Sequence, residues 1–456
     1  MRHLPFWPAH QTSLSGGTVT LLLIIGLSAC APGGTAAQAT AFPGHHIAPQ
    51  GPVCDGALVP SDPVSPGTLY AFHFVGGDPT GVSQGQLTLS ALDTRTGAQR
   101  WQEPVLGQPT LVGGILYTAG GSAGDSTGMQ ALDANTGKTL WTHAGLAGAG
   151  GSSSFPPVLA NGIAYIGTSQ NGPGQSGVYA LRASDGTLLW SYPATNTNFS
   201  PFTVDDGMIY VTAWTSANAA EPVVTILALR AGTGTLLWQY SFHDGIPTGP
   251  AQVANGMIYF SMTQNTNPQG GVVGALRGSD GSLAWSQPVT GRPHIFALTG
   301  QTVYVAFGPD PMNAGVEAFG AIDGTILWKN PQQIFPFPVL ADGVIYGNGP
   351  RPGQTIALDA SSGKALWQAS GAFPSSTSEP VEENGAVYTI GNGINALRAS
   401  DGKLLWTHPA TCQFPSQHPL LAIGNTVYYA YHYVQAIGKE AYHVYALRAA
   451  DGKALW

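Results

Sequence analysis

One eleven-residue motif recurs nine times along this chain of 456 residues. Each copy begins with Ala and an apolar residue, passes through a Gly-containing turn and ends on Trp. The copies span 91–101, 131–141, 180–190, 228–238, 275–285, 318–328, 357–367, 396–406 and 446–456. Successive tryptophans are 40, 49, 48, 47, 43, 39, 39 and 50 positions apart. Periods in the forties are typical of β-propellers with four strands in each blade, so the repeat predicts an all-β propeller.

Two positions of the motif have a clear physical role. The seventh residue is always Gly, which adopts the positive φ of a tight turn without steric cost. The eleventh is Trp, whose ring we expect to be structural, buried between neighbouring blades with its N–H bonded to a carbonyl. The glycines are Gly97, Gly137, Gly186, Gly234, Gly281, Gly324, Gly363, Gly402 and Gly452, and the tryptophans are Trp101, Trp141, Trp190, Trp238, Trp285, Trp328, Trp367, Trp406 and Trp456.

A second unit, Asn/Asp-Gly-x-x-Tyr, lies between the motifs, as at Asn161 to Tyr165 and Asp206 to Tyr210. Asn-Gly and Asp-Gly between apolar runs indicate hairpins. We therefore expect each blade to be an inner strand, a hairpin, a Tyr-bearing strand, the Ala-Leu strand and the Trp strand. Residues 52–456 form a single propeller domain in this interpretation. Eight blades with atypical ends are favoured, and nine remain possible because residues 52–90 contain strand-like sequence.

The composition agrees with closely spaced strands, since the chain has 62 Gly, 35 Pro and only 9% charged residues. Sixteen basic residues stand against 24 acidic ones, for a net charge of −8 and no basic run. Binding to phosphates needs concentrated Lys and Arg, so the sequence argues against a nucleic-acid partner.

The first 29 residues are interpreted as a signal peptide. An apolar run from Val19 to Ala29 is too short to span a bilayer but suits a signal-peptide core. It ends in Leu27-Ser28-Ala29-Cys30, which resembles the lipobox of bacterial lipoproteins. Cys30 is then the lipidated N-terminus, and residues 30–51, small and rich in Pro, form a flexible tether. The alternative is an ordinary signal peptide with a chance cysteine at its end.

The motif A-L-D-x-x-T-G-K-x-L-W, best preserved at 131–141 and 357–367, resembles the pyrroloquinoline-quinone-like propeller repeat. The resemblance covers almost all of the chain after the tether. It implies the propeller fold but not one function. The family includes quinoprotein alcohol dehydrogenases that bind the quinone and Ca²⁺, the propeller lipoprotein of outer-membrane protein assembly, and repeat proteins without a cofactor.

The cofactor site of those dehydrogenases is not evident here. They hold the quinone between a Trp and a disulfide of adjacent cysteines, whereas this chain has only Cys30, Cys54 and Cys412. Ca²⁺ collects six to eight oxygens, several of them from carboxylates, and the sequence shows no such set. Quinone and Ca²⁺ remain possible but without support, and we expect no cofactor, metal or catalytic residue.

Two clusters of ionisable residues are weighed as sites and set aside. Glu379, Glu382 and Glu383 form the densest group of acids, interpreted as a solvated loop rather than as ligands. His418, His432 and His443 lie among tyrosines in the last repeat, but zinc needs three or four converging ligands. We interpret these histidines as ordinary surface or packing residues.

Cys54 and Cys412 are the two thiols that remain once Cys30 is acylated. In an exported protein they are expected to form a disulfide that joins the first blade to the last. The alternative is two independent buried thiols.

These observations favour a non-catalytic binding or scaffolding lipoprotein, which presents its propeller outside a bacterial membrane to a protein or cell-envelope partner. We expect a monomer attached to the membrane by its lipid. The alternative is a quinone-dependent dehydrogenase or sugar oxidoreductase with an atypical site.

Overall fold

The computed structural model is built of β-strands, and its described residues contain no helix. Accordingly, they include no helix long and apolar enough to cross a membrane. The described residues are 19–24, 67–75, 86–121, 127–146, 151–152, 155–170, 175–195, 197–199, 202–215, 223–242, 245–264, 270–308, 314–334, 338–349, 351, 353–371, 379–390, 393–409, 420–436 and 439–456.

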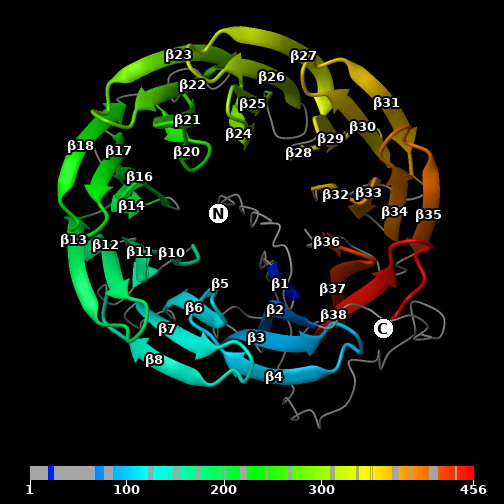
Figure 1. Ribbon diagram of the computed structural model, residues 1–456, viewed down its shortest axis with the longest axis horizontal. Coiled ribbons are helices and arrows are strands. Elements are labelled where there is room, and N and C mark those ends of the chain that lie inside the picture. The colour runs from blue at the N-terminus through cyan, green and yellow to red at the C-terminus, as the bar shows by residue number, and fades with distance from the viewer. Residues whose placement is uncertain are drawn as a thin grey trace. The chain divides into compact units, whose positions relative to one another are not determined.

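The strands form nine sheets, the blades of a β-propeller, so the blade count is the nine that the sequence allowed rather than the eight that it favoured. The chain divides into two compact units. Unit 1 comprises residues 1–105, 351–355 and 367–456, and unit 2 comprises residues 106–350 and 356–366. Figure 1 labels the strands of each blade.

Unit 2 holds blades 2 to 6, and blade 7 has residues in both units. Blade 2 is β5 (Pro109–Val112), β6 (Ile115–Gly120), β7 (Gly128–Asp133) and β8 (Thr139–His143). Blade 3 is β9 (Gly151–Ser152), β10 (Val158–Ala160), β11 (Ile163–Gln170), β12 (Gln175–Arg182) and β13 (Leu188–Thr195). Blade 4 is β14 (Thr197–Phe199), β15 (Thr203–Asp205), β16 (Met208–Thr215), β17 (Val224–Arg230) and β18 (Leu236–Phe242). Blade 5 is β19 (Ile246–Pro247), β20 (Gln252–Ala254), β21 (Met257–Thr263), β22 (Gly270–Arg277) and β23 (Leu283–Thr290). Blade 6 is β24 (His294–Leu298), β25 (Thr302–Phe307), β26 (Ala314–Gly320) and β27 (Ile326–Ile334).

Blade 7 is β28 (Val339–Ala341), β29 (Val344–Asn348), β30 (Gln354–Asp359) and β31 (Ala365–Ser370). Blades 8, 9 and 1 belong to unit 1. Blade 8 is β32 (Val381–Glu383), β33 (Ala386–Ile390), β34 (Gly393–Arg398) and β35 (Leu404–Pro409). Blade 9 is β36 (Leu420–Ile423), β37 (Thr426–Ala436) and β38 (Lys439–Arg448), and the backbone of Ala454 to Trp456 pairs with β38 as a short fourth strand. Blade 1 is β1 (Val19–Ile24), β2 (Gly67–Val75), β3 (Gln86–Asp93) and β4 (Gln99–Pro104).

Blade 1 differs from the others at its inner edge. The inner strand of blades 2 to 9 pairs antiparallel with the next strand, as Val381 does with Tyr388 in blade 8. In blade 1 this position holds β1, which pairs parallel with β2 from Val19 opposite Gly67 to Ile24 opposite Phe72. These residues lie inside the segment that the sequence predicts to be a signal peptide.

The core lies between the flat faces of successive blades. The second and third strands of a blade are buried on both faces, as β33 is along its whole length. The outer strand is only half-buried, and on alternate residues, as in β18. In unit 2, for example, Tyr165 and Val178 of blade 3 pack with Ile209 and Val211 of blade 4. Within a unit, a blade thus buries its apolar face against its neighbour, as propeller repeats do.

In blades 2 to 9, two kinds of turn lie on the same edge of the blade, which we call the turn face. The inner turn joins the first two strands, and the outer turn joins the last two. In blade 3 the outer-turn residue Ala183 donates its N–H to the inner-turn carbonyl of Gly162 at 2.9 Å, and Ala399 bonds Gly385 likewise in blade 8. The turn face of these blades is therefore formed by paired turns.

Candidate functional site

The outer turns form sockets for the motif tryptophans of the preceding blade. In unit 2, Trp190 Nε1 donates to the carbonyl of Ala231 at 2.9 Å, and its ring lies against Gly234. Gly234 has a φ of +69°, and a Cβ there would overlap the Trp190 ring. Tyr165 Oη donates to the same Ala231 carbonyl at 3.2 Å, so two aromatic donors of one blade share one acceptor in the next.

The same indole hydrogen bond recurs along the repeat. In unit 2 the donors and acceptors are Trp141 with Ala183, Trp190 with Ala231, Trp238 with Gly278, Trp285 with Ala321, and Trp328 with Ala360. In unit 1 they are Trp367 with Ala399, Trp406 with Ala449, and Trp456 with Thr94. The acceptor is a backbone atom each time, so the motif tryptophans are engaged in joining blades. The sequence analysis did not anticipate that the hydroxyls of Tyr117 and Tyr165 donate to carbonyls of the next blade. The recurrent Asn/Asp-Gly-x-x-Tyr unit is a signal for these hydrogen bonds.

A β-bulge beside each motif Trp explains how the indole reaches the next blade. In blade 4, Ala228 is paired with Trp238 and Leu229 with Leu236, so Leu237 is the extra residue on β18. A bulge bends and twists the strand locally and re-aims a side chain. It also leaves two consecutive apolar residues, Leu236 and Leu237, exposed by 38% and 39%.

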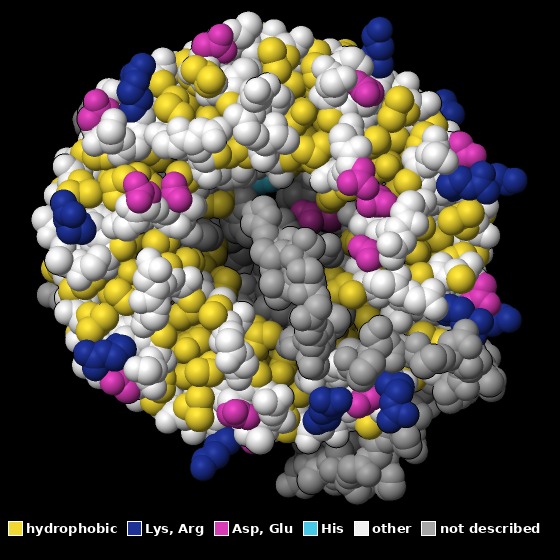
Figure 2. Space-filling view, viewed as in Figure 1, with side chains coloured by type: hydrophobic (Ala, Val, Ile, Leu, Met, Phe, Trp, Pro, Cys, Tyr) yellow, Lys and Arg dark blue, Asp and Glu magenta, His cyan; other side chains and the backbone are white. Residues whose placement is uncertain are grey.

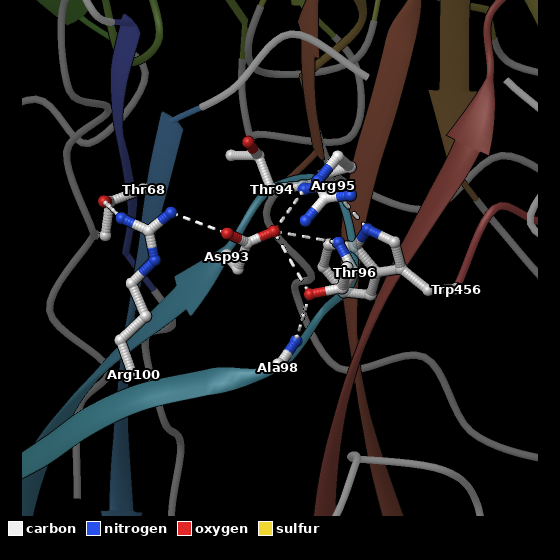
Figure 3. Close-up of polar contacts among 8 residues, drawn as sticks. All are labelled: Thr68, Asp93, Thr94, Arg95, Thr96, Ala98, Arg100 and Trp456. Atoms are coloured by element: carbon white, nitrogen blue, oxygen red, sulfur yellow. Dashed lines mark hydrogen bonds and ion pairs between the residues drawn. The ribbon is translucent and has the colours of Figure 1, made fainter. Parts of the chain in front are cut away.

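The last blade meets the first in unit 1 through the same socket (Figure 3). Trp456 Nε1 donates to Thr94 O at 2.8 Å, and the Trp456 ring lies against Gly97. On the other side of this turn, Arg100 pairs with Asp93 at 2.6 Å and donates to Thr68 Oγ1 at 2.8 Å. Arg100 occupies the bulge position that Leu237 holds in blade 4. The socket therefore joins the two ends of the repeat array.

The acids of the outer turns serve the turns themselves. Asp133 Oδ1 accepts the N–H groups of Asn135 and Thr136, and the Thr136 hydroxyl holds the pKa of Asp133 below its usual range. Asp185 accepts from the backbone N–H of Thr187, and the bonds from Thr187 with the Arg182 guanidinium lower the pKa of Asp185 to about 2. Such turn carboxylates are committed to backbone donors.

The three glutamates that the sequence groups together lie on and next to β32 of blade 8, and the prediction of a solvated loop was wrong for Glu382 and Glu383. Glu382 accepts from Gly385 N at 2.9 Å, and Glu383 accepts from Gly424 N of blade 9 at 3.1 Å. They therefore order the inner turns. Glu379 comes before the strand, and burial raises its pKa to about 7.

The histidines of the last repeat do not converge where they are described. His418 lies outside the described residues. His432 is on β37 and His443 on β38, and His443 is paired with Tyr431, the neighbour of His432. A histidine that the sequence did not single out, His294 on β24, has its pKa lowered to about 4 by burial.

One ion pair with a buried carboxylate was also not anticipated from the sequence. Glu317 on β26 is paired in register with Lys329 on β27 and forms a salt bridge with it, although the Glu317 side chain is only 3% exposed. Lys329 Nζ also lies 4.3 Å from the centre of the Phe307 ring. Val305 and Phe307 flank this pair within the apolar contact between blades 5 and 6.

The described residues offer no set of ligands for Ca²⁺ or zinc, because nowhere do three His, Cys, Asp or Glu side chains gather. They do not fit the quinone-and-calcium site of the dehydrogenases, whose metal needs several carboxylates. Cys30, Cys54 and Cys412 lie outside the described residues.

The inner turns carry the remaining acids of the turn face. Asn161, Asp206, Asn255, Asp342 and Asn384 have φ between 44° and 54°, and each precedes a Gly with positive φ. Asp205, Asp206 and Asp342 lie at inner turns of unit 2, as Glu382 and Glu383 do in unit 1, and these turns contain neither Lys nor Arg. Figure 2 shows acidic side chains (magenta) as well as Lys and Arg (dark blue) on the face in view.

Comparison with known proteins places these features in a family. The family described as outer membrane protein assembly factor BamB matches residues 55–172, 128–303 and 312–456. Tetrathionate hydrolase of Acidithiobacillus ferrooxidans is 22% identical over 370 residues, which are 70% of this chain and 69% of that protein. Outer membrane protein assembly factor BamB of Yersinia pestis is 24% identical over 353 residues, 73% of this chain and 72% of the relative.

Solved structures with a similar fold include BamB from Moraxella catarrhalis, with 16% identity and a TM-score of 0.44 over 70% of this chain and 92% of that one. Quinohemoprotein alcohol dehydrogenase from Comamonas testosteroni has 14% identity and a TM-score of 0.46, over 77% of this chain and 75% of the dehydrogenase. The family match spans most of the sequence, and the chain belongs to the BamB family of pyrroloquinoline-quinone-like β-propeller repeat proteins.

Proposed function

We propose that this protein is a non-catalytic scaffolding lipoprotein of the bacterial cell envelope, which presents its propeller to a protein partner. The observation that carries the proposal is the row of exposed apolar pairs on the outer strands. Leu188 with Leu189, Leu236 with Leu237, and Ile326 with Leu327 are between 38% and 52% exposed in blades 3, 4 and 6.

Single exposed apolar residues are normal on soluble proteins, but repeated and contiguous ones mark interaction surfaces. The bulge next to each motif Trp keeps both residues of a pair exposed at the edge strand. These pairs are therefore a built feature of the repeat. A partner that covers several of them would bury apolar area, which drives protein association.

The relatives support the same function. Two proteins named outer membrane protein assembly factor BamB, from Yersinia pestis and Moranella endobia, are each 24% identical to this chain and match 73% and 61% of it. Their name indicates a part in assembling outer membrane proteins. We propose by analogy that this chain also binds a protein of the envelope.

Attachment to the membrane is proposed to depend on acylation of Cys30 after removal of residues 1–29. Cleavage there also removes β1, which leaves β2 as the edge strand of blade 1. Cys30→Ser should leave the propeller folded and move the protein from the membrane fraction to the soluble one. A variant that stays in the membrane fraction and still lacks lipid would overturn the anchor.

The catalytic alternatives are separated by two assays. One follows the absorbance of the protein with pyrroloquinoline quinone and Ca²⁺, together with dye-linked oxidation of alcohols and sugars. The other measures loss of tetrathionate, because one relative is named for that hydrolysis. We expect no quinone spectrum and no turnover. A shifted quinone spectrum with substrate oxidation, or consumption of tetrathionate, would replace scaffolding with catalysis.

A further inference from the structure

The outer turns of blades 8, 9 and 1 carry an excess of positive charge. Each has two cations and one carboxylate, six cations against three acids in all. We call the cations Arg95, Arg100, Arg398, Lys403, Arg448 and Lys453 the basic turn set. In unit 2 the six outer turns balance, with Lys138, Arg182, Arg230, Arg277 and Lys364 against Asp133, Asp185, Asp280, Asp323 and Asp359. The excess therefore contrasts with the rest of a chain whose net charge is −8.

The three turns are brought together by the tryptophan sockets of unit 1. Trp406 of blade 8 donates to Ala449 O at 2.7 Å, and its ring lies against Gly452 in the outer turn of blade 9. Trp456 of blade 9 then donates to Thr94 O in the outer turn of blade 1. Residues up to 362 positions apart in the sequence thus lie on three successive blades. In Figure 2, dark-blue side chains lie together over β4 and the C-terminal end of the chain.

Three members of the set are exposed, and two of them form no ion pair with a described residue. Arg398, Arg448 and Arg100 are held by the carboxylates of Asp401, Asp451 and Asp93 in their own turns. Arg95 and Lys403 are exposed and make no ion pair with another described residue, and Lys453 is 71% exposed at 3.5 Å from Asp451. Exposed side chains of this kind remain hydrated and can extend towards a ligand.

Apolar side chains accompany these cations. Lys403 is followed by Leu404 and Leu405, which are 40% and 44% exposed at the start of β35. Basic residues next to exposed leucines suit the boundary between lipid headgroups and acyl chains.

The path of the chain points to the occupant. The chain reaches blade 1 at Gly67, whose carbonyl accepts the N–H of Thr94 at 3.3 Å, so it arrives on the turn face beside the basic turn set. Thirty-six residues separate Cys30 from Gly67. The predicted tether of residues 30–51 precedes β2 in the sequence, so a lipid on Cys30 would keep this turn face close to the membrane.

We infer that the basic turn set is a docking surface for anionic lipid headgroups, which orients the outer turns of blades 8, 9 and 1 towards the membrane. The inference rests on the proposed function only for the lipid anchor. Juxtamembrane Lys and Arg are attracted by a negative surface potential that falls off within a Debye length. Reversible contact by the exposed cations Arg95, Lys403 and Lys453 would thus fix the orientation of a protein that its tether alone leaves free to rotate.

The test compares three full-length proteins that all carry Cys30→Ser, so that no lipid is attached. The first has no other change, and the second has Arg95→Glu, Lys403→Glu and Lys453→Glu. The third is a matched control with Lys138→Glu, Arg230→Glu and Lys364→Glu, which makes the same change in net charge on exposed outer-turn residues of unit 2. Each is sedimented with vesicles of phosphatidylcholine alone or with about one third phosphatidylglycerol, at low and at high salt.

We expect the first and third proteins to bind the anionic vesicles in a salt-sensitive way and to bind neutral vesicles weakly. The second should bind anionic vesicles at least about tenfold less tightly, while its melting temperature matches that of the third. Equal loss in the second and third proteins would show a general charge effect and overturn the inference, as would absence of binding to anionic vesicles. Neither outcome depends on Cys30 acylation, so fractionation of Cys30→Ser still tests the anchor separately.

Discussion

At the scale of single residues, the seventh position of the motif is fixed by two constraints at once. Gly234 needs a positive φ, and the Trp190 ring occupies the space that a Cβ would take. The sequence predicted the first constraint from the turn pattern. It could not predict the second, because the ring comes from the preceding blade and contacts between repeats are invisible in the motif itself.

Gly234→Ala should therefore destabilise the protein more than Gly207→Ala. Gly207 has a similar φ of +71° but open space around its Cα, so its alanine variant carries only the left-handed strain of about 1–2 kcal/mol. Gly234→Ala adds overpacking of about 1–3 kcal/mol. Urea unfolding of both variants measures the difference, and equal midpoints would mean that the indole does not fill the socket.

Glu379 gives a pH dependence of stability with a definite sign. Burial raises the pKa of this carboxyl from 4.5 to about 7, so the folded state binds its proton more tightly than the unfolded state. Stability from this group is then greatest below pH 4.5 and is lost as pH rises through 7, by at most about 3 kcal/mol.

Melting of the wild type and Glu379→Gln between pH 5 and 8 measures this contribution. The wild type should lose stability relative to the amide variant as pH rises across that interval. Parallel melting curves would mean that Glu379 is solvated in the folded protein.

At the scale of elements, the sequence predicted the strands and turns of a blade. It did not predict the bulge of the outer strand or the parallel inner strand of blade 1. Hairpin signals such as Asn161-Gly162 and the Ala-Leu and Trp strands were placed correctly because alternation and turn residues are local. The bulge that extrudes Leu189 or Leu237 was not predicted, since it depends on the indole reaching the next blade. Nor was the parallel strand β1, because the apolar run of Val19–Ile24 carries no antiparallel hairpin signal.

Trp238→Ala tests the contact between blades 4 and 5. It removes a half-buried ring and the indole bond of 2.8 Å to Gly278 O, and loss of a buried Trp costs about 3–5 kcal/mol. The neighbouring Leu237→Ala, at an exposed bulge position, should stay within about 0.5 kcal/mol of the wild type. If thermal unfolding shows Leu237→Ala to be less stable than Trp238→Ala, the side of β18 that packs against blade 5 is not the one that carries Trp238.

At the scale of the whole molecule, the number of blades and the basic turn set show what a repeat sequence leaves open. Nine motifs were compatible with eight or nine blades until residues 67–104 were seen to form a blade with β2, β3 and β4. The charge excess escaped sequence analysis because no basic run exists. It arises only when the first outer turn meets the last two through Trp456 and Trp406.

Cys54 and Cys412 remain predicted to form a disulfide between the two ends of the array. Closing a loop of 358 positions would stabilise the fold by about 4–5 kcal/mol on chain-entropy grounds, and less if the bond is strained. Mass spectrometry of a non-reduced digest should find one peptide pair that contains both cysteines. Two separately alkylated thiols would establish the alternative of independent cysteines.

The central claim is that the exposed apolar pairs of the outer strands receive a protein partner in the envelope. A photoreactive amino acid in place of Leu237 should crosslink in living cells to one envelope protein of defined mass. The same probe should lose that product when Leu188→Ser and Leu189→Ser are introduced on the preceding blade, while the melting temperature is unchanged. A product that survives these substitutions, or no product from probes at Leu189, Leu237 and Leu327, would contradict the scaffolding account.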